Sequence, residues 1–270
     1  MTPERVYGVD FSGAKRAGNK IWIAGGAMAC DTLRIDICQS AATLPGSGAH
    51  LEEALAALRA FVHQQSPCVV GVDFPFGLPV DIVEEKHWDE FAREFRSHYP
   101  DADSFQTQCT LTALRKTGQK EIRRATDKEA RTPFSPYNRR IYRQTYYGIR
   151  DFIAPLVNSG IASVLPMQPA LSDRAWLLEV CPASTLKQLS LSRPYKGRSY
   201  GQVRVDLLAQ IAQAYMLTVP DWLAGTVRTD HEGDALDGVI AAAVTYRSLR
   251  GVIRTDGFAE PALVEGRVYV

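Results

Sequence analysis

The apolar residues of this chain alternate between the period of a strand and the period of a helix, and this alternation predicts the order of the elements. Short apolar runs separated by turn residues predict strands, of which the first three form an antiparallel meander. The expected strands cover residues 5–11, 19–29, 32–38, 68–74 and 174–180. Apolar residues at the helical period predict a helix after the meander, at residues 50–65, and a last helix at residues 230–249.

These elements follow the order strand, strand, strand, helix, strand, long insert, strand, helix. A meander that leads through a helix into further parallel strands predicts an α/β fold with one antiparallel edge of the sheet. Between about residues 84 and 158 the helical period continues, in residues 86–99 and 138–157, and no strand pattern appears. We therefore expect a single domain over residues 1–270 with a mostly helical insertion at about 84–158.

Composition changes this picture little. The 270 residues are 46% hydrophobic, which suffices for one domain with a full core, and the net charge is only +1. No apolar run reaches the roughly 18 residues of a membrane span, and the charged start MTPER is unlike a signal peptide, so we expect a cytoplasmic protein without membrane contact. The five cysteines form no C-x-x-C pair and are expected to be reduced thiols.

The charge of the insertion is uneven. From Arg115 to Arg150 there are eleven basic and three acidic residues, a net charge of +8. Arginines mixed with tyrosines are typical of surfaces that bind a nucleic-acid backbone and stack its bases, although a solvated helix with its tyrosines packed on the core has the same pattern. The candidate nucleic-acid-binding residues are Arg131, Arg139, Arg140, Arg143 and Tyr146.

Two predicted strands end in the same four residues, Gly-Val-Asp-Phe, which leave Asp10 and Asp73 at their carboxyl ends. Ligands of α/β sheets gather at these ends. Glu179 lies near the end of a later strand, and Asp234 and Asp237 are three residues apart on the last helix, so they share a face.

Clustered carboxylates repel one another and raise one another's pKa unless a cation neutralises them, and Mg²⁺ and Mn²⁺ prefer such oxygen ligands. The predicted catalytic residues are Asp10, Asp73, Glu179, Asp234 and Asp237, and all of them except Glu179 are predicted metal ligands.

Simpler explanations exist for single acids. An Asp after a strand often starts a turn or caps a helix. Thr229 and Glu232 have the spacing of a capping box before the last helix, and Asp230 suits the helix dipole, so these residues need no catalytic role. Beyond Asp234 and Asp237 the last helix is apolar on every side, and burial of an unpaired charge is costly, so we expect these two residues at the open end of the helix, facing a site.

The segments GVDFSGA, GVDFPFGLP, LEVCPAST and HEGDALDGVIAA, in this order, resemble the family called domain of unknown function 429, whose members are predicted nucleases of the RNase H-like (RuvC-like) superfamily. The resemblance spans most of the chain, and the basic segment RRATDKEARTPFSP is similar to the family's variable middle region. It implies a five-stranded mixed sheet with the five acids around one or two Mg²⁺ or Mn²⁺ ions. Two such ions hydrolyse a phosphodiester bond without a covalent nucleophile, in DNA or in RNA.

Two other classes of protein remain as alternatives to a nuclease. An actin-like or sugar-kinase ATPase also begins with a Gly-x-Asp strand, and Lys15 could contact a phosphate, but such enzymes need a second domain and an Asp-x-Gly loop where this chain has Asp-Phe-Pro. The third class is a metal-free binding module that has kept the fold and lost the chemistry. Bound metal would separate it from a nuclease, and the sequence is compatible with a monomer or a dimer.

Overall fold

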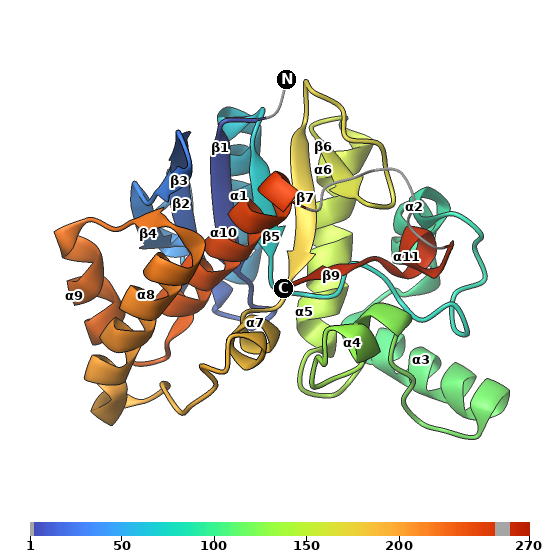
Figure 1. The fold of residues 1–270 in the computed structure, drawn as a ribbon. Coiled ribbons are helices and arrows are strands. Elements are labelled where there is room, and N and C mark those ends of the chain that lie inside the picture. Colours follow the sequence, from blue (N-terminus) through green and yellow to red (C-terminus); the bar gives the residue numbers. More distant parts are fainter. Residues whose placement is uncertain (1–2, 252–259) are drawn as a thin grey trace.

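The computed structural model describes residues 3–251 and 260–270, and these residues form a mixed α/β structure (Figure 1). One nine-stranded sheet has the order β6-β7-β5-β1-β2-β3-β8, with β4 paired to β2 and β9 paired to β7. The strands are β1 (Arg5–Asp10), β2 (Trp22–Ala29), β3 (Thr32–Arg34), β4 (Ile37–Ser40), β5 (Val69–Val72), β6 (Ala162–Leu165), β7 (Ala175–Val180), β8 (Leu217–Thr218) and β9 (Val268–Tyr269). The family resemblance implied five strands, and this number is wrong for the present chain.

The pairing of the strands agrees with the predicted topology. β1 pairs antiparallel with β2 and parallel with β5, so the two Gly-Val-Asp strands are neighbours with Gly8 beside Gly71. β5 and β6 both pair parallel with β7. The predicted third strand is divided at Ile35–Asp36 into β3 and β4, and both parts pair antiparallel with β2. The strands β6, β8 and β9 were not predicted, since each has only two to four residues.

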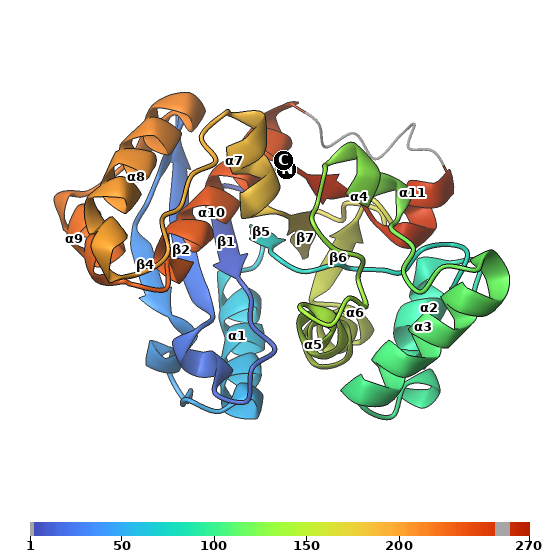
Figure 2. The same cartoon turned by 90° about the horizontal axis from the view of Figure 1, so that it is seen from below.

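Helices cover both faces of the sheet, with α8 and α10 on one face and α1, α5 and α6 on the other (Figure 2). The helices are α1 (Leu51–Gln65), α2 (Trp88–His98), α3 (Ala102–Thr117), α4 (Ala125–Glu129), α5 (Tyr142–Tyr147), α6 (Ala154–Asn158), α7 (Pro182–Gln188), α8 (Gly201–Tyr215), α9 (Asp221–Thr229), α10 (Asp234–Gly251) and α11 (Glu260–Glu265). A π-helical segment, η3 (Gly148–Ile153), joins α5 to α6, and short 3-10 turns are η1 (Ala17–Asn19), η2 (Ala41–Thr43) and η4 (Arg198–Tyr200). Two hydrophobic cores result, one on each side of the sheet.

Alternation along β1 decides what each side chain faces. Tyr7 and Val9 lie in the core beneath α1, whereas Val6 lies in the core beneath α10. Gly8 points the same way as Val6, and a Cβ there would lie 1.9 Å from the backbone nitrogen of Ala242 in α10. The glycine of each Gly-Val-Asp motif thus lets α10 pack against the sheet backbone, and the aspartate two residues later is directed along α10 toward its first turn.

The segment from 84 to 158 contains helices and no strand, as predicted. Two helix boundaries differ from the predictions. The helix predicted from residue 138 begins at Tyr142, so Arg139 and Arg140 lie in the preceding turn. The last helix begins at Asp234 and not at residue 230.

Within the described residues, no helix combines the length and the apolar character that crossing a membrane requires. All five cysteines are free thiols, and Cys38, Cys68 and Cys109 are buried. Cys30, in contrast, is exposed on the turn between β2 and β3.

Candidate metal centre

Three of the predicted acids meet at the carboxyl end of β1. One carboxylate oxygen each from Asp10, Asp234 and Asp237 lies within 4.8 Å of the other two. Asp10 is 9% exposed and Asp237 is 4% exposed, whereas Asp234 is half-buried. The predicted convergence of a strand end and the first turn of the last helix is therefore present in the structure.

Asp73 lies beside this cluster. Its backbone N–H donates to the carbonyl of Val9 at 3.0 Å, which continues the parallel pairing of β5 with β1 and places Asp73 next to Asp10. Burial raises the pKa of Asp73 to about 8, and the negative charge of Asp237 adds to this rise.

Asp10 and Asp234 also have raised pKa values. Burial and the charges of Asp237, Asp234 and Asp73 raise the pKa of Asp10 well above its ordinary range. Burial raises the pKa of Asp234 to about 6, although Lys196 opposes that rise. A cluster of carboxylates in which burial and neighbouring negative charge oppose ionisation is a site that favours a cation.

The sequence prediction missed a lysine that partly neutralises the cluster and a tyrosine that donates a hydrogen bond to it. Lys196 Nζ lies 2.9 Å from Asp237 Oδ2 and 3.6 Å from Asp234 Oδ1, and the Tyr195 hydroxyl donates to Asp237 Oδ1 at 2.7 Å. Both residues lie in the connection between α7 and η4, which has neither strand nor helix periodicity. Its one sequence signal is an aromatic and a basic residue side by side, which occurs by chance on many surfaces.

The first turn of α10 is capped differently from the prediction. Thr229 ends α9, where its hydroxyl donates to the carbonyl of Gly225 at 2.9 Å. The side chain that accepts from the first turn of α10 is Asp230, whose Oδ2 receives the N–H of Ala235 at 2.8 Å. The predicted capping box of Thr229 and Glu232 is therefore wrong, because α10 begins later than expected and Asp230 takes that role.

Glu179 does not join the aspartates, because it faces the other side of the sheet. In the register of β5 and β7, Glu179 is paired with Val72, whose side chain lies in the core beneath α1. The residue of β7 beside Asp73 is instead Val180. Arg124 donates from both terminal nitrogens to the two oxygens of Glu179, and the N–H of Phe76 donates to Oε2 at 2.9 Å.

Arg124 is the centre of a second buried polar network. It is fully buried, and its Nε and Nη2 also donate to Asp127, at 3.1 and 2.8 Å. Its Nη1 donates to the backbone carbonyl of Glu265 at 2.9 Å. The Glu265 carboxylate in turn accepts the backbone N–H groups of Val80 and Ala125, both at 2.8 Å. The network therefore joins β7, the helical insertion, the loop after β5 and the C-terminal segment.

The insertion residues predicted to bind nucleic acid divide into two groups. Arg131, Arg139, Arg140 and Arg143 are exposed. Tyr146 is fully buried; its hydroxyl donates to the carbonyl of Tyr99 at 3.0 Å and accepts from Arg150 at 2.8 Å. Its ring packs in the core and presents no face on which a base could stack.

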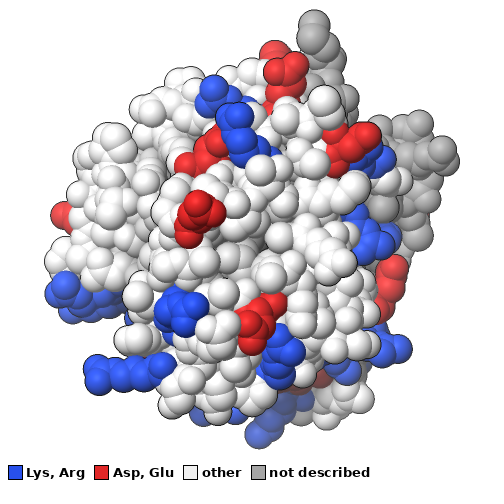
Figure 3. Space-filling model, turned by 60° about the vertical axis from the view of Figure 1, so that its left-hand side comes forward, with Lys and Arg blue, Asp and Glu red and all other residues white. Residues whose placement is uncertain are grey.

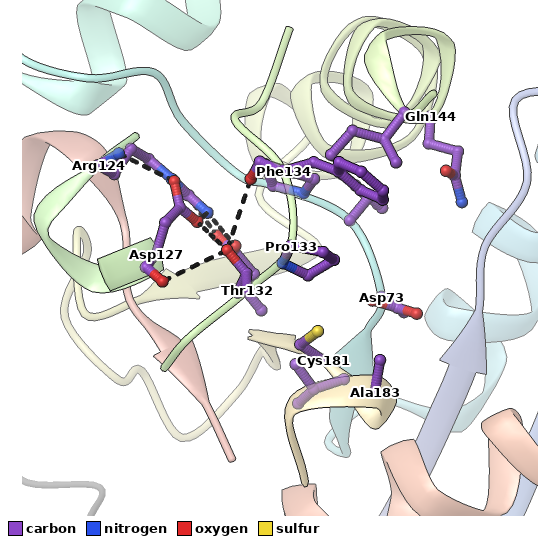
Figure 4. Close-up of a pocket in the computed structure, with 14 residues that line it drawn as sticks. Asp73, Arg124, Asp127, Thr132, Pro133, Phe134, Gln144, Cys181 and Ala183 are labelled. Atoms are coloured by element: carbon purple, nitrogen blue, oxygen red, sulfur yellow. Dashed lines mark hydrogen bonds and ion pairs between the residues drawn. The ribbon is translucent and has the colours of Figure 1, made fainter. Parts of the chain in front are cut away.

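A cavity of about 190 Å³ lies between the insertion and the carboxyl ends of β5 and β7 (Figure 4). Arg124, Asp127 and Thr132 line one side, and the rings of Pro133 and Phe134 line another (Figure 4). Cys181 and Ala183, at the start of α7, and Asp73 line a further side, and the carboxyl group of Asp73 is directed away from Thr132 and Pro133 (Figure 4). Asp73 thus lies between this cavity and the aspartate cluster.

The fold and the site define a mixed α/β protein with a carboxylate centre where parallel strands end against the first turn of a buried helix. The family model described as Protein of unknown function (DUF429) matches residues 8–145, and the chain belongs to this family. The match begins in β1 and ends in α5, so it includes Asp10, Asp73 and most of the insertion. No curated protein and no solved structure matches the chain.

Proposed function

We propose that this chain is a metal-dependent nuclease of the RNase H-like type, which hydrolyses phosphodiester bonds of DNA or RNA. The observation that supports this proposal most is the convergence of Asp10, Asp234 and Asp237 within 4.8 Å, with Asp73 beside them. Hard divalent ions prefer such oxygen donors and usually keep substrate phosphates as further ligands. The free thiols also suit the reducing cytoplasm.

The donor set fits Mg²⁺ or Mn²⁺, which Asp10, Asp73, Asp234 and Asp237 would hold. When bound, the metal supplies a Lewis acid that activates water and stabilises the leaving oxygen of the phosphodiester. The chain's own residues prepare the site. Tyr195 orients Asp237 by its hydrogen bond, and Lys196, whose pKa the neighbouring aspartates raise, stays charged and lies where it can also pair with a phosphate.

In this proposal Glu179 does not bind the metal. Its two oxygens are bound by Arg124 and by the N–H of Phe76, so its function is to hold the insertion against β7. The exposed arginines of the insertion would contact the nucleic-acid backbone.

An ATPase of the actin-like or sugar-kinase type has less support. Such an enzyme needs a second loop that presents its backbone to phosphate. The loop after β5 instead buries Phe74 and Phe76 in the core beneath α1, where their rings pack at 5.0 Å between centroids. A Cβ at Gly148 of the insertion would lie 2.4 Å from the Phe74 ring, so the loop also packs against the insertion.

The proposed function is tested by cleavage of short single-stranded and double-stranded DNA and RNA in Mg²⁺ or Mn²⁺. We expect cleavage by the wild type and a loss of more than about 100-fold in Asp10→Asn, because even residues that only support metal ligands contribute 10- to 100-fold. Asp206→Asn, which changes an exposed carboxylate on α8, is the matched control and should keep full activity. If no substrate is cleaved in either metal, the nuclease proposal is wrong.

Thermal unfolding of the same variants tests the metal centre separately from cleavage. Asp10→Asn should leave the melting temperature without metal unchanged or higher, because it removes carboxylate repulsion. It should also reduce the stabilisation that Mn²⁺ gives the wild type. A strongly destabilised variant that Mn²⁺ stabilises as much as wild type would show that Asp10 has a structural function.

A further inference from the structure

The cavity beside Asp73 has apolar walls and a polar floor whose groups bind one another. Phe74, Pro75, Pro133, Phe134 and Ile141 supply the walls. In the floor, the two oxygens of Glu179 and those of Asp127 are occupied by Arg124. The Thr132 hydroxyl also donates to Asp127, at 3.2 Å. Few floor groups are left to bind a ligand, so the cavity selects by shape and by contact with flat or apolar groups.

The size of the cavity limits the ligand to a single ring system. Its volume of about 190 Å³ is below the roughly 300–1,000 Å³ of pockets for drug-sized molecules. Phe134 is half-buried at the rim, and the Arg140 guanidinium lies 5.3 Å from the centroid of its ring, which fixes the aromatic wall beside an exposed positive charge. This arrangement suits a ligand with a neutral, flat ring that enters the cavity and an anionic group that stays outside it.

The position of the cavity identifies that ligand. Asp73 is both a lining residue and a neighbour of the aspartate cluster, so a group in the cavity is adjacent to a phosphate held at the metal centre. We propose that the cavity binds one unstacked nucleobase of the nucleic acid next to the phosphate that is cleaved, an inference that rests on the proposed nuclease function. Because stacking surfaces are common to all bases, recognition is by insertion of the base with little discrimination between base types.

The test uses adenosine 5′-monophosphate, cytidine 5′-monophosphate and ribose 5-phosphate as probes, titrated calorimetrically into the full chain with Mg²⁺. Both nucleotides should bind at least about fivefold more tightly than ribose 5-phosphate, the smaller end of a base-stacking contribution. Ala183→Phe places a ring in the cavity from an exposed helix position and should reduce both nucleotides to the affinity of ribose 5-phosphate. Phe134→Ala, which removes the aromatic wall, should weaken the nucleotides and leave ribose 5-phosphate unchanged.

The matched control is Ala209→Phe, the same substitution at an exposed position of α8, which should bind all three probes like wild type. Nucleotide affinity equal to that of ribose 5-phosphate, or unchanged by Ala183→Phe, would overturn the base pocket. Equal binding of N-acetyl-leucine amide would assign the cavity to an apolar side chain and would also overturn it. Base binding without any cleavage would contradict the nuclease and retain the pocket, whereas cleavage unaffected by Ala183→Phe would contradict the pocket and retain the nuclease.

Discussion

At the scale of single residues, the site is a balance between carboxylates and one ammonium group. Four aspartates meet, and among the described residues Lys196 forms ion pairs with Asp237 and Asp234 while the Tyr195 hydroxyl donates to Asp237. Lys196 lowers the pKa of Asp10, Asp73 and Asp234, but burial and mutual repulsion outweigh it in each case. Without metal, this arrangement costs stability whenever the aspartates are ionised.

The pH dependence of stability should report this cost. Because the pKa of Asp73 is about 8 in the folded protein and ordinary in the unfolded chain, the folded state holds more protons between about pH 4 and pH 8. The free energy of unfolding without metal should therefore fall as pH rises through this window. The measurement is urea unfolding from pH 5 to pH 9 in the presence of a chelator. Over this range the free energy of unfolding of Asp73→Asn should fall less than that of the wild type, by more than about 1 kcal/mol, the value of one pKa unit.

The control for this measurement is Asp206→Asn, which should retain the wild-type slope because Asp206 is exposed. A wild-type stability that rises between pH 5 and pH 8, or a slope that Asp73→Asn leaves unchanged, would contradict the prediction.

The sequence could predict which aspartates meet, but not that Glu179 lies outside their cluster. Asp10 and Asp73 end identical motifs, so their side chains have the same phase in neighbouring strands. The side chain of Glu179 lies on the opposite face of the sheet, and this follows only from the strand register, which pairs Glu179 with Val72. Its partner Arg124 is 55 residues away in sequence, and no local pattern connects the two. Lys196 and Tyr195 could not be predicted, because an irregular connection brings them to the site.

At the scale of elements, the packing of α10 against the sheet decides whether the site can form. The helix lies on the backbone of β1 and β5 because Gly8 and Gly71 have no side chain in its path. A Cβ at Gly71 would lie 1.8 Å from Thr245 Oγ1, and one at Gly8 would meet backbone atoms that cannot rotate away. In each Gly-Val-Asp motif the glycine therefore lets α10 pack against the sheet, and the aspartate lies at the proposed metal centre.

Gly8→Ala should destabilise the protein by at least about 3 kcal/mol, the upper end of ordinary overpacking, because α10 must shift as a unit. The matched control is Gly225→Ala in α9, where a Cβ meets nothing within 4 Å, and it should be neutral or stabilising by up to about 1 kcal/mol. Urea unfolding measures both. A Gly8→Ala variant as stable as Gly225→Ala would show that α10 is not in close contact with β1.

The buried network around Arg124 joins β7 to the insertion, so its loss should destabilise the protein. Arg124→Met should destabilise the protein by about 3–5 kcal/mol, because Glu179 and Asp127 would remain buried without their cation. Arg123→Met, at an exposed neighbour, should change stability by less than about 1 kcal/mol. Addition of Glu179→Gln to Arg124→Met should recover part of the loss, since one unpaired charge is removed. If Arg124→Met is as stable as Arg123→Met, the network does not hold the insertion.

The accuracy with which each helix or strand was predicted increases with its length and regularity. Long periodic segments such as α1 and α10 were found with small errors at their ends, and the parallel pairing of β1 with β5 was expected. The start of α5 was misplaced because the polar turn before it, which includes Arg139 and Arg140, continues the helical spacing without adopting it. Strands of two to four residues have no period to recognise.

At the scale of the whole molecule, the positive charge of the insertion is only partly available to a partner. Arg124 is buried in its network, and Arg150 pairs with Asp151 at 2.6 Å. Figure 3 brings forward the side of the molecule with α8 and α9, away from the insertion, and there basic and acidic side chains are interspersed over a largely uncharged surface. Nucleic-acid binding, if the proposal is correct, therefore depends on a few exposed arginines more than on overall charge.

Two of these arginines, Arg139 and Arg143, differ in how freely they can contact phosphate. Arg139 has no ion-pair partner among the described residues, whereas Arg143 lies 3.5 Å from Asp103 and donates from Nε to the Tyr142 hydroxyl at 2.9 Å. In the Asp10→Asn background, in which we expect no cleavage, Arg139→Ala should lower the slope of log affinity against log salt by about 0.7 for single strands and 0.9 for duplexes. Arg143→Ala should lower the slope less, because Asp103 competes with phosphate for its guanidinium.

Binding of a labelled single strand and a labelled duplex from about 50 to 200 mM salt provides these slopes. Arg34→Ala is the matched control, since Arg34 is an exposed arginine on β3, far along the sheet from the insertion, and should leave the slope unchanged. Both insertion variants should weaken different sequences equally, because phosphate contacts carry no base information. No detectable binding at the lowest salt, or identical slopes for Arg34→Ala and Arg139→Ala, would contradict nucleic-acid binding by the insertion and leave the metal centre as the remaining part of the proposal.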